Sequence, residues 1–281
     1  MKRTLMLMFA VAALAIAMIA PAGAVTDGEL DNDGHPQVVL LVADVGDGGW
    51  RCSATMLSPT VVLTAGHCVS NYPNDAEIDG MRIFPDADVQ QWVPEDPENP
   101  TADQHYPGPG VHAIEAVHWE AHPLYETAPF FVHDVGVVIL DGPGLVLDQD
   151  QYGELPEVDQ LDVMKTRRGK QDTTFTAVGY GLQRINPVFV EAERVRMVAN
   201  PRLIQINTPG FTGDFSLLLS NNHATGGTCF GDSGGPNFLG DSNVIAGVTS
   251  FGLNGNCAGT GGVFRMDRQN VLDFVNGFMQ E

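Results

Sequence analysis

The chain has 281 residues, of which 43% are hydrophobic and 17% are charged. This length and composition suit one large globular domain or two small ones, and they exclude a mainly disordered chain. The 35 acidic residues outnumber the 14 basic ones and give a formal net charge of −21. The basic surface that nucleic-acid binding requires is therefore missing from the composition, and we expect no nucleic-acid partner.

The first 24 residues have the features of a secretory signal peptide. Lys2 and Arg3 precede an apolar run at residues 5–20, and residues 22–24 (Ala-Gly-Ala) match the small-residue site that signal peptidase cuts. A membrane anchor is the alternative interpretation, but this apolar run is short for a membrane span. We therefore expect a secreted protein, extracellular or periplasmic, that has no membrane anchor and begins at Val25.

Short β-rich runs recur between glycine and proline residues, which indicates an all-β domain. They lie at residues 38–43, 60–64, 135–140, 173–178 and 244–249. The stretch at residues 85–110 holds six prolines among acidic and amide residues, and we expect a surface insertion without a barrel strand there.

Near the C-terminus, apolar residues recur at helical spacing. Val271, Leu272, Val275 and Phe278 fall on one face, and Asp267 precedes them in a position where its side chain could cap a helix. The sequence therefore predicts that the chain closes with an amphipathic helix.

Four cysteines in an exported chain favour two disulfides, and three pairings are open. Cys52 with Cys68 and Cys229 with Cys257 would close short loops, so we favour local pairing. Each bond would stabilise the fold by roughly 3 kcal/mol in the chain-entropy model. A zinc site built from all four is disfavoured, because no two cysteines have the close spacing of zinc knuckles.

Three segments carry residues that suit nucleophilic catalysis. Residues 64–68 contain His67, residues 133–140 place Asp134 before an apolar run, and residues 231–236 (Gly-Asp-Ser-Gly-Gly-Pro) set Ser233 among glycines. Each segment alone has a purely structural explanation, but the combination in the order His, Asp, Ser is specific. A serine hydroxyl is a weak nucleophile that needs a base to accept its proton, and the base needs a carboxylate to orient it.

A metallopeptidase motif is the competing interpretation. His118 and His122 lie four residues apart with Glu120 between them. However, a zinc-binding helix needs the glutamate directly after the first histidine, and Pro123 disfavours helical geometry at His122. An acidic loop at residues 75, 77 and 79 could bind calcium, but such loops are expected in so acidic a protein. We assign no metal site.

The three catalytic segments resemble the chymotrypsin-like (trypsin-like) serine protease family, in the form of a bacterial-type secreted member. The resemblance covers nearly the whole mature chain, because further family segments follow in order at residues 122–125, 179–181, 250–252 and 262–264. It implies a peptidase domain over residues 25–281. This domain would comprise two six-stranded antiparallel barrels, at about 25–148 and about 149–281, with the C-terminal helix and an active site between the barrels.

The resemblance also implies a role for each site residue. Ser233 is the nucleophile, His67 the general base and Asp134 the carboxylate that fixes the imidazole tautomer. The backbone N–H groups of Gly231 and Ser233 form the oxyanion hole. The residues expected to bind the substrate backbone are Ser250, Phe251 and Gly252.

The primary specificity pocket is expected at Gly227, Thr228, Gly252 and Gly262. Gly227 stands where trypsin has a carboxylate, so we expect no strong preference for Arg or Lys before the scissile bond. The two wall glycines, Gly252 and Gly262, leave room for a large or medium apolar side chain such as Phe, Tyr, Leu or Met.

Val25 resembles the mature N-terminus of the family, and its ammonium is expected to pair with Asp232. The implied function is a secreted serine endopeptidase that forms an acyl-enzyme, needs no cofactor and is a monomer. Protein or peptide substrates and protein inhibitors are the expected partners. The alternative is a catalytically inactive homologue that binds a partner, but such proteins usually lose a triad residue, and none is missing here.

Overall fold

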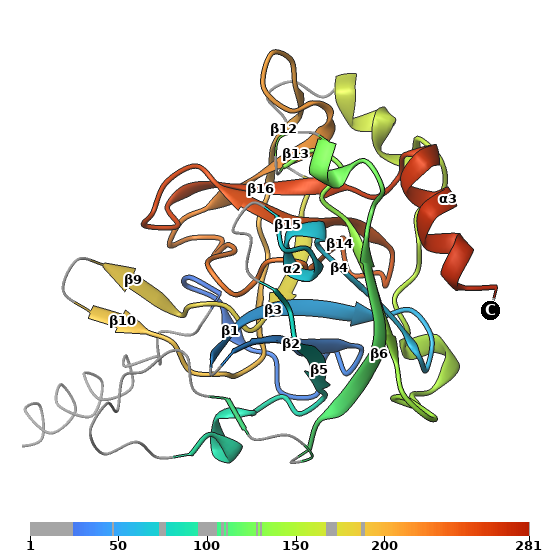
Figure 1. Ribbon diagram of the computed structural model, residues 1–281. Coiled ribbons are helices and arrows are strands. Elements are labelled where there is room, and N and C mark those ends of the chain that lie inside the picture. The colour runs from blue at the N-terminus through green and yellow to red at the C-terminus, as the bar shows by residue number, and fades with distance from the viewer. Residues whose placement is uncertain are drawn as a thin grey trace, which may run out of the picture.

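The computed structural model describes residues 25–46, 48–72, 77–94, 106–107, 110, 112–127, 129, 131–166, 173–186 and 189–280. The expected signal peptide and much of the insertion at 85–110 lie outside these ranges. The described chain is mostly β, with a C-terminal helix packed at one side (Figure 1). The all-β prediction is therefore confirmed.

The first half forms a closed six-stranded antiparallel barrel in the order β2-β3-β4-β7-β6-β5. Its strands are β2 (Val38–Val45), β3 (Gly48–Met56), β4 (Val61–Thr64), β5 (Gly80–Phe84), β6 (Ile114–Ala121) and β7 (Gly136–Leu140). β2 is buried on both faces, which explains its unbroken apolar run. Leu41 belongs to the core inside the barrel, whereas Leu40 packs in a cluster with Phe238 of the second half.

The second half curls eight strands into one antiparallel sheet, in the order β1-β11-β8-β14-β15-β16-β13-β12. Its strands are β1 (Glu29–Leu30), β8 (Phe175–Gly179), β11 (Met197–Ala199), β12 (Leu203–Thr208), β13 (Gly213–Asn221), β14 (Pro236–Leu239), β15 (Ile245–Gly252) and β16 (Gly259–Arg265). A separate hairpin pairs β9 (Arg184–Asn186) with β10 (Phe189–Glu191).

This sheet is a curled half-barrel, where the resemblance implied a second closed barrel of six strands. Pro201 lies between β11 and β12, and a proline cannot donate a backbone hydrogen bond. The curl still brings β8 beside the start of β12. The N–H of Phe175 donates to the Pro201 carbonyl at 2.9 Å, and the N–H of Leu203 donates to the Thr173 carbonyl at 3.0 Å.

The first described residues belong to the second half rather than to the first barrel. β1 pairs with β11 in the register Leu30↔Met197. The buried Arg196 donates from Nε to Asp31 at 2.9 Å, and its other nitrogens reach carbonyls that include Val38. The N-terminal segment is thereby fixed beside the loops that carry the candidate site.

The helical elements are short. They are α2 (Gly66–Val69), α3 (Gln269–Phe278) and the 3-10 segments η1 (Gln90–Trp92), η2 (Tyr125–Thr127), η3 (Gln149–Gln151) and η4 (Gln160–Thr166). The C-terminal helix is confirmed as α3, but the predicted cap is wrong. Arg268 is the N-cap residue, whereas Asp267 is buried, pairs with Arg265 and accepts the N–H of Leu161. A buried guanidinium needs a carboxylate partner, and this requirement outweighs capping.

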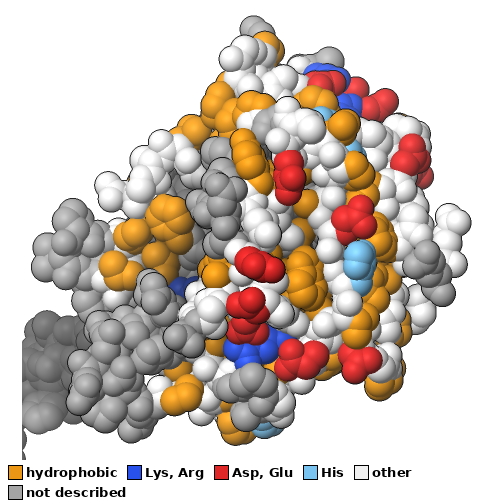
Figure 2. Space-filling model, in the orientation of Figure 1, with side chains coloured by type: hydrophobic (Ala, Val, Ile, Leu, Met, Phe, Trp, Pro, Cys, Tyr) orange, Lys and Arg blue, Asp and Glu red, His pale blue; other side chains and the backbone are white. Residues whose placement is uncertain are grey.

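The surface reflects the acidic composition. On the face that carries β6, acidic side chains outnumber Lys and Arg (Figure 2). Glu115 and Glu120 of β6 are exposed on this barrel wall. Among the helices in the described ranges, none is long and apolar enough to span a bilayer.

Candidate active site

His67 lies in α2, which follows β4 after a single residue. The disulfide between Cys52 and Cys68 ties this short helix to β3. Gly66 precedes the histidine because space is tight there: a Cβ would meet the Tyr125 ring at 3.1 Å. The sequence around the histidine thus fixes the position of the imidazole.

Asp134 lies directly behind the imidazole and is fully buried. Its Oδ2 is 2.9 Å from Nδ1 of His67, and its Oδ1 accepts the backbone N–H of His67 at 2.9 Å. The hydroxyl of Ser250 donates to Oδ2 at 2.5 Å. These donors fix the position of the carboxyl group, which in turn holds the proton on Nδ1 and leaves Nε2 to accept one.

Two opposing effects act on the pKa of His67. Burial of the ring lowers the pKa, whereas the charge of Asp134 and the hydrogen bond to it raise it. The attraction outweighs the burial, so the pKa of His67 is raised from its ordinary value of 6.5. An imidazole in this environment accepts a proton more readily than a free one.

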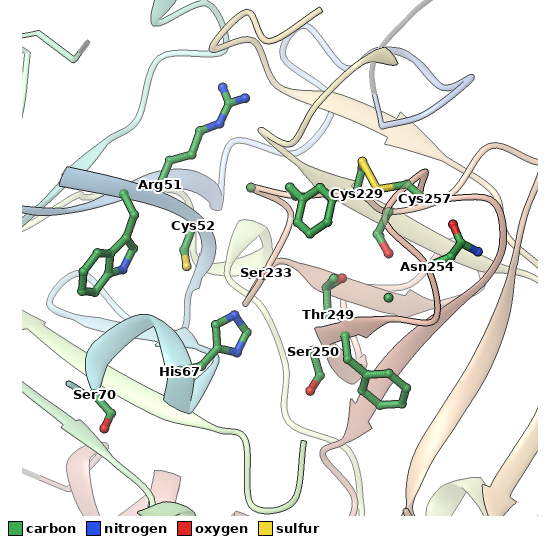
Figure 3. Close-up of a pocket in the computed structure, with 16 residues that line it drawn as sticks. Arg51, Cys52, His67, Ser70, Cys229, Ser233, Thr249, Ser250, Asn254 and Cys257 are labelled. Carbon is green, nitrogen blue, oxygen red and sulfur yellow. A yellow bond between two sulfur atoms is a disulfide. The ribbon is translucent and has the colours of Figure 1, made fainter. Parts of the chain in front are cut away.

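Ser233 and His67 line the same cavity, which has a volume of about 590 Å³ (Figure 3). Ser53 supports the serine loop from behind: its N–H donates to the Ser233 carbonyl at 2.8 Å, and its hydroxyl donates to the Gly231 carbonyl at 2.9 Å. Gly231 has a φ of +96°, a conformation that favours glycine. Within the described ranges, the N–H groups of Gly231 and Ser233 have no hydrogen-bond acceptor. They are therefore available to a substrate oxygen.

Asp232 is buried beside the serine and points away from the cavity toward the segment at 179–181. Its carboxylate accepts the N–H groups of Gly181 and Cys229, each at 2.8 Å. Burial raises the pKa of Asp232 to about 6, although these hydrogen bonds and the charge of Arg51 act to lower it. A Cβ on Gly179 or Gly181 would overlap this carboxylate, which explains the Gly-Tyr-Gly sequence.

Val25, the expected partner of Asp232, is completely buried against Val195, Met197 and Ala199. The next residue, Thr26, bridges the loop before the serine: its carbonyl accepts the N–H of Gly227 at 3.1 Å. The N-terminal segment therefore packs against the serine loop, and the ammonium pair itself stays a prediction.

The expected pocket residues are only partly brought together. Thr228 and Gly252 line the cavity. Gly262 does not form its wall, because a Cβ on this residue would meet the Phe251 ring at 2.3 Å. The preceding Gly261 is paired with Gly252 instead, and a Cβ there would face the Thr228 hydroxyl. The register therefore favours Gly261 over Gly262 as the wall residue, and neither Gly262 nor Gly227 is among the residues that line the cavity.

The two disulfides are Cys52–Cys68 and Cys229–Cys257, as local pairing predicted. This result excludes the four-cysteine zinc site. The metallopeptidase interpretation also fails, because His118 lies on the strand β6 and the buried His122 accepts the N–H of Leu124. Of the acidic loop, residue 75 lies outside the described ranges.

A comparison with models of protein families shows to which family this chain belongs. The family model described as Trypsin matches residues 29–275. The chain belongs to the trypsin family. Membership makes the protein a serine endopeptidase. The solved structure of HL collagenase has the same fold: it aligns with a TM-score of 0.64 and 18% identity, over 91% of this chain and 99% of that one.

Two residues of this trypsin-family site were not predicted in their observed roles. Ser250 was expected to bind the substrate backbone, which stays a prediction, and its side chain has a second role because it contacts Asp134. Ser53 was not singled out, because a serine inside a strand carries no signal of its own. Both contacts join segments that are more than 100 residues apart, so only the fold brings them together.

Proposed function

We propose that the protein is a secreted serine endopeptidase that uses Ser233, His67 and Asp134 as a catalytic triad. The observation that supports this most strongly is the buried Asp134 carboxylate bonded to His67 at the edge of the cavity that Ser233 also lines. This geometry suits a base that is held in one tautomer and faces a nucleophile.

The chemistry follows from these positions. The hydroxyl of Ser233 attacks the substrate carbonyl while Nε2 of His67 takes its proton. The N–H groups of Gly231 and Ser233 donate to the oxygen that becomes negative. The imidazolium then gives its proton to the leaving amine, and an acyl-enzyme remains. Water hydrolyses this ester by the same steps, with His67 again as the base.

Export and activation are proposed to be one event. The Ala-Gly-Ala sequence before Val25 suits signal peptidase, and the two disulfides suit an oxidising compartment of the kind in which bacterial-type secreted members work. Cleavage would free the Val25 ammonium to pair with Asp232. The burial of Val25 and the bridge from Thr26 to Gly227 support this placement.

The proposed substrates are proteins or peptides with an uncharged side chain before the scissile bond. Support comes from the two glycines that flank the pocket, Gly252 and Gly261, and from the absence of a side chain at Gly227. We further propose that the enzyme works as a monomer and that protein inhibitors could occupy the same cavity.

A fluorophosphonate probe tests the proposal, because it reacts with an activated serine and requires no knowledge of the substrate. The mature chain should be labelled at Ser233, and Ser233→Ala should abolish labelling. Ser242→Ala, in an exposed turn, is the matched control and should label normally. A folded, processed chain that fails to label would instead support the inactive, partner-binding homologue.

A further inference from the structure

We propose that Asn221 forms the floor of the primary specificity pocket, where its side-chain oxygen selects an uncharged residue that ends in a hydrogen-bond donor, above all tyrosine. This inference rests on the proposed function, because it concerns the same cavity. It adds a specificity residue at the end of β13, the strand that leads into the loop before Ser233.

The register of the sheet places Asn221 on the pocket side. Gly252 of β15 is paired with Gly261 of β16, and Gly261 is paired with Leu219 of β13. Residues paired across antiparallel strands direct their side chains to the same face, as do residues two apart on one strand. Asn221 therefore shares the sheet face on which the pocket glycines Gly252 and Gly261 lie.

The side chain of Asn221 fills the space at Gly227. A Cβ placed on Gly227 would lie 2.4 Å from Cγ and 2.6 Å from Oδ1 of Asn221. Under the proposed function, Gly227 is the position from which trypsin-like enzymes direct a carboxylate into the pocket. Here no side chain starts from that position, and the amide of Asn221 occupies the volume instead.

The amide is oriented with its oxygen free. Nδ2 of Asn221 donates to the Thr228 carbonyl at 2.7 Å, and Thr228 lines the cavity. The oxygen Oδ1 is buried and has no donor within the described part of the chain, and the residue is only 1% exposed. A buried acceptor without a donor is unfavourable, so a substrate group that donates to it gains affinity.

The free Oδ1 of Asn221 distinguishes between the large apolar and aromatic side chains that the pocket is proposed to accept. The phenol of tyrosine donates one hydrogen bond and carries no charge, whereas phenylalanine leaves Oδ1 without a partner. Lysine and arginine would bring a charge that the neutral Asn221 amide cannot compensate. The overlap at Gly227 also shows that Gly227→Asp is a poor route to basic specificity, and that Asn221→Asp is the better one.

Two peptides that differ only in Tyr or Phe before the scissile bond test this inference on the mature enzyme. We expect the Tyr peptide to have a kcat/KM about 10-fold higher or more. Asn221→Leu should bring the ratio near one, mainly by slowing the Tyr peptide. Asn221→Asp should raise cleavage of a Lys or Arg peptide at least about 10-fold. Asn222→Asp adds the same charge at an exposed neighbouring position and should leave all ratios unchanged.

Fluorophosphonate labelling separates failure of this inference from failure of the proposed function. Normal labelling with equal cleavage of the Tyr and Phe peptides by the unmodified enzyme would overturn the role of Asn221, and this comparison needs no variant to fold. An Asn221→Leu enzyme that labels normally and keeps the Tyr preference would also overturn it. Absence of both labelling and cleavage of every peptide would instead overturn the proposed function.

Discussion

An extra residue before Val25 should reveal the electrostatic role of Asp232. In a chain that begins one residue earlier, the ammonium is displaced and the buried carboxylate lacks its expected partner. The pKa of Asp232 is raised from 3.8 to about 6 by burial. This difference corresponds to about 3 kcal/mol, since one pKa unit is worth 1.36 kcal/mol.

The pKa of Asp232 is higher in the folded chain than in the unfolded chain, so protonation of this carboxylate stabilises the fold. This stabilisation is fully present below pH 3.8 and is lost as the pH rises through about 6. At pH 8 the extended chain therefore carries an uncompensated carboxylate that costs about 3 kcal/mol. Asp232→Asn removes this charge but keeps an acceptor for only one of the Gly181 and Cys229 N–H groups, so it should change the stability of the extended chain little. In the chain that begins at Val25, the same substitution leaves a buried ammonium unpaired and should be destabilising.

Urea denaturation followed by tryptophan fluorescence measures the effect of Asp232→Asn on the free energy of unfolding, in the extended chain and in the chain that begins at Val25, at pH 5 and pH 8. A Ser233→Ala background prevents self-digestion during the measurement. At pH 8, Asp232→Asn should destabilise the chain that begins at Val25 by clearly more than it changes the stability of the extended chain. An equal effect of the same sign in both chains, or full peptidase activity of the extended Ser233 enzyme, would refute the ammonium pair.

Three further predictions concern the triad and the second disulfide. The kcat/KM should rise with pH through a pKa of His67 above 6.5, and Asp134→Asn should lower both that pKa and kcat; an inflection below 6.5 in the unmodified enzyme would contradict this. Ser250→Ala removes a hydrogen bond to a buried carboxylate, worth about 1.5–3 kcal/mol, so steady-state kinetics should show a roughly 10- to 100-fold loss of kcat/KM. An unchanged value would show that the carboxylate is held well enough without the hydroxyl. Replacing Cys229 and Cys257 by alanine should cost about 3–4 kcal/mol in urea denaturation, and an unchanged midpoint would refute this contribution.

Local sequence patterns predicted much of the fold. The five β-rich runs all fall within strands or overlap them, because alternating or continuous apolar residues mark strands that face a core. Among the strands that were not predicted, β3 contains two glycines and β16 contains three. Glycines lower the strand signal, and the positions of these strands are set by pairing with their neighbours.

The pocket shows why the rest could not be predicted. Gly261 and Gly262 are adjacent and identical, so only the pairing of Gly261 with Gly252 decides which one forms the wall. Asn221 meets Gly227 within the loop that follows β13, through a side-chain contact that no motif marks. Motifs therefore locate the reacting groups, whereas strand register determines the shape of the pocket.

Mass spectrometry of acid-quenched enzyme during turnover of a peptide ester tests the central claim most directly. We predict one added acyl group on the fragment that contains Ser233, with no adduct on Ser233→Ala and far slower adduct formation on His67→Ala. An acyl group on another residue, or turnover by the Ser233→Ala enzyme at the normal rate, would contradict the account.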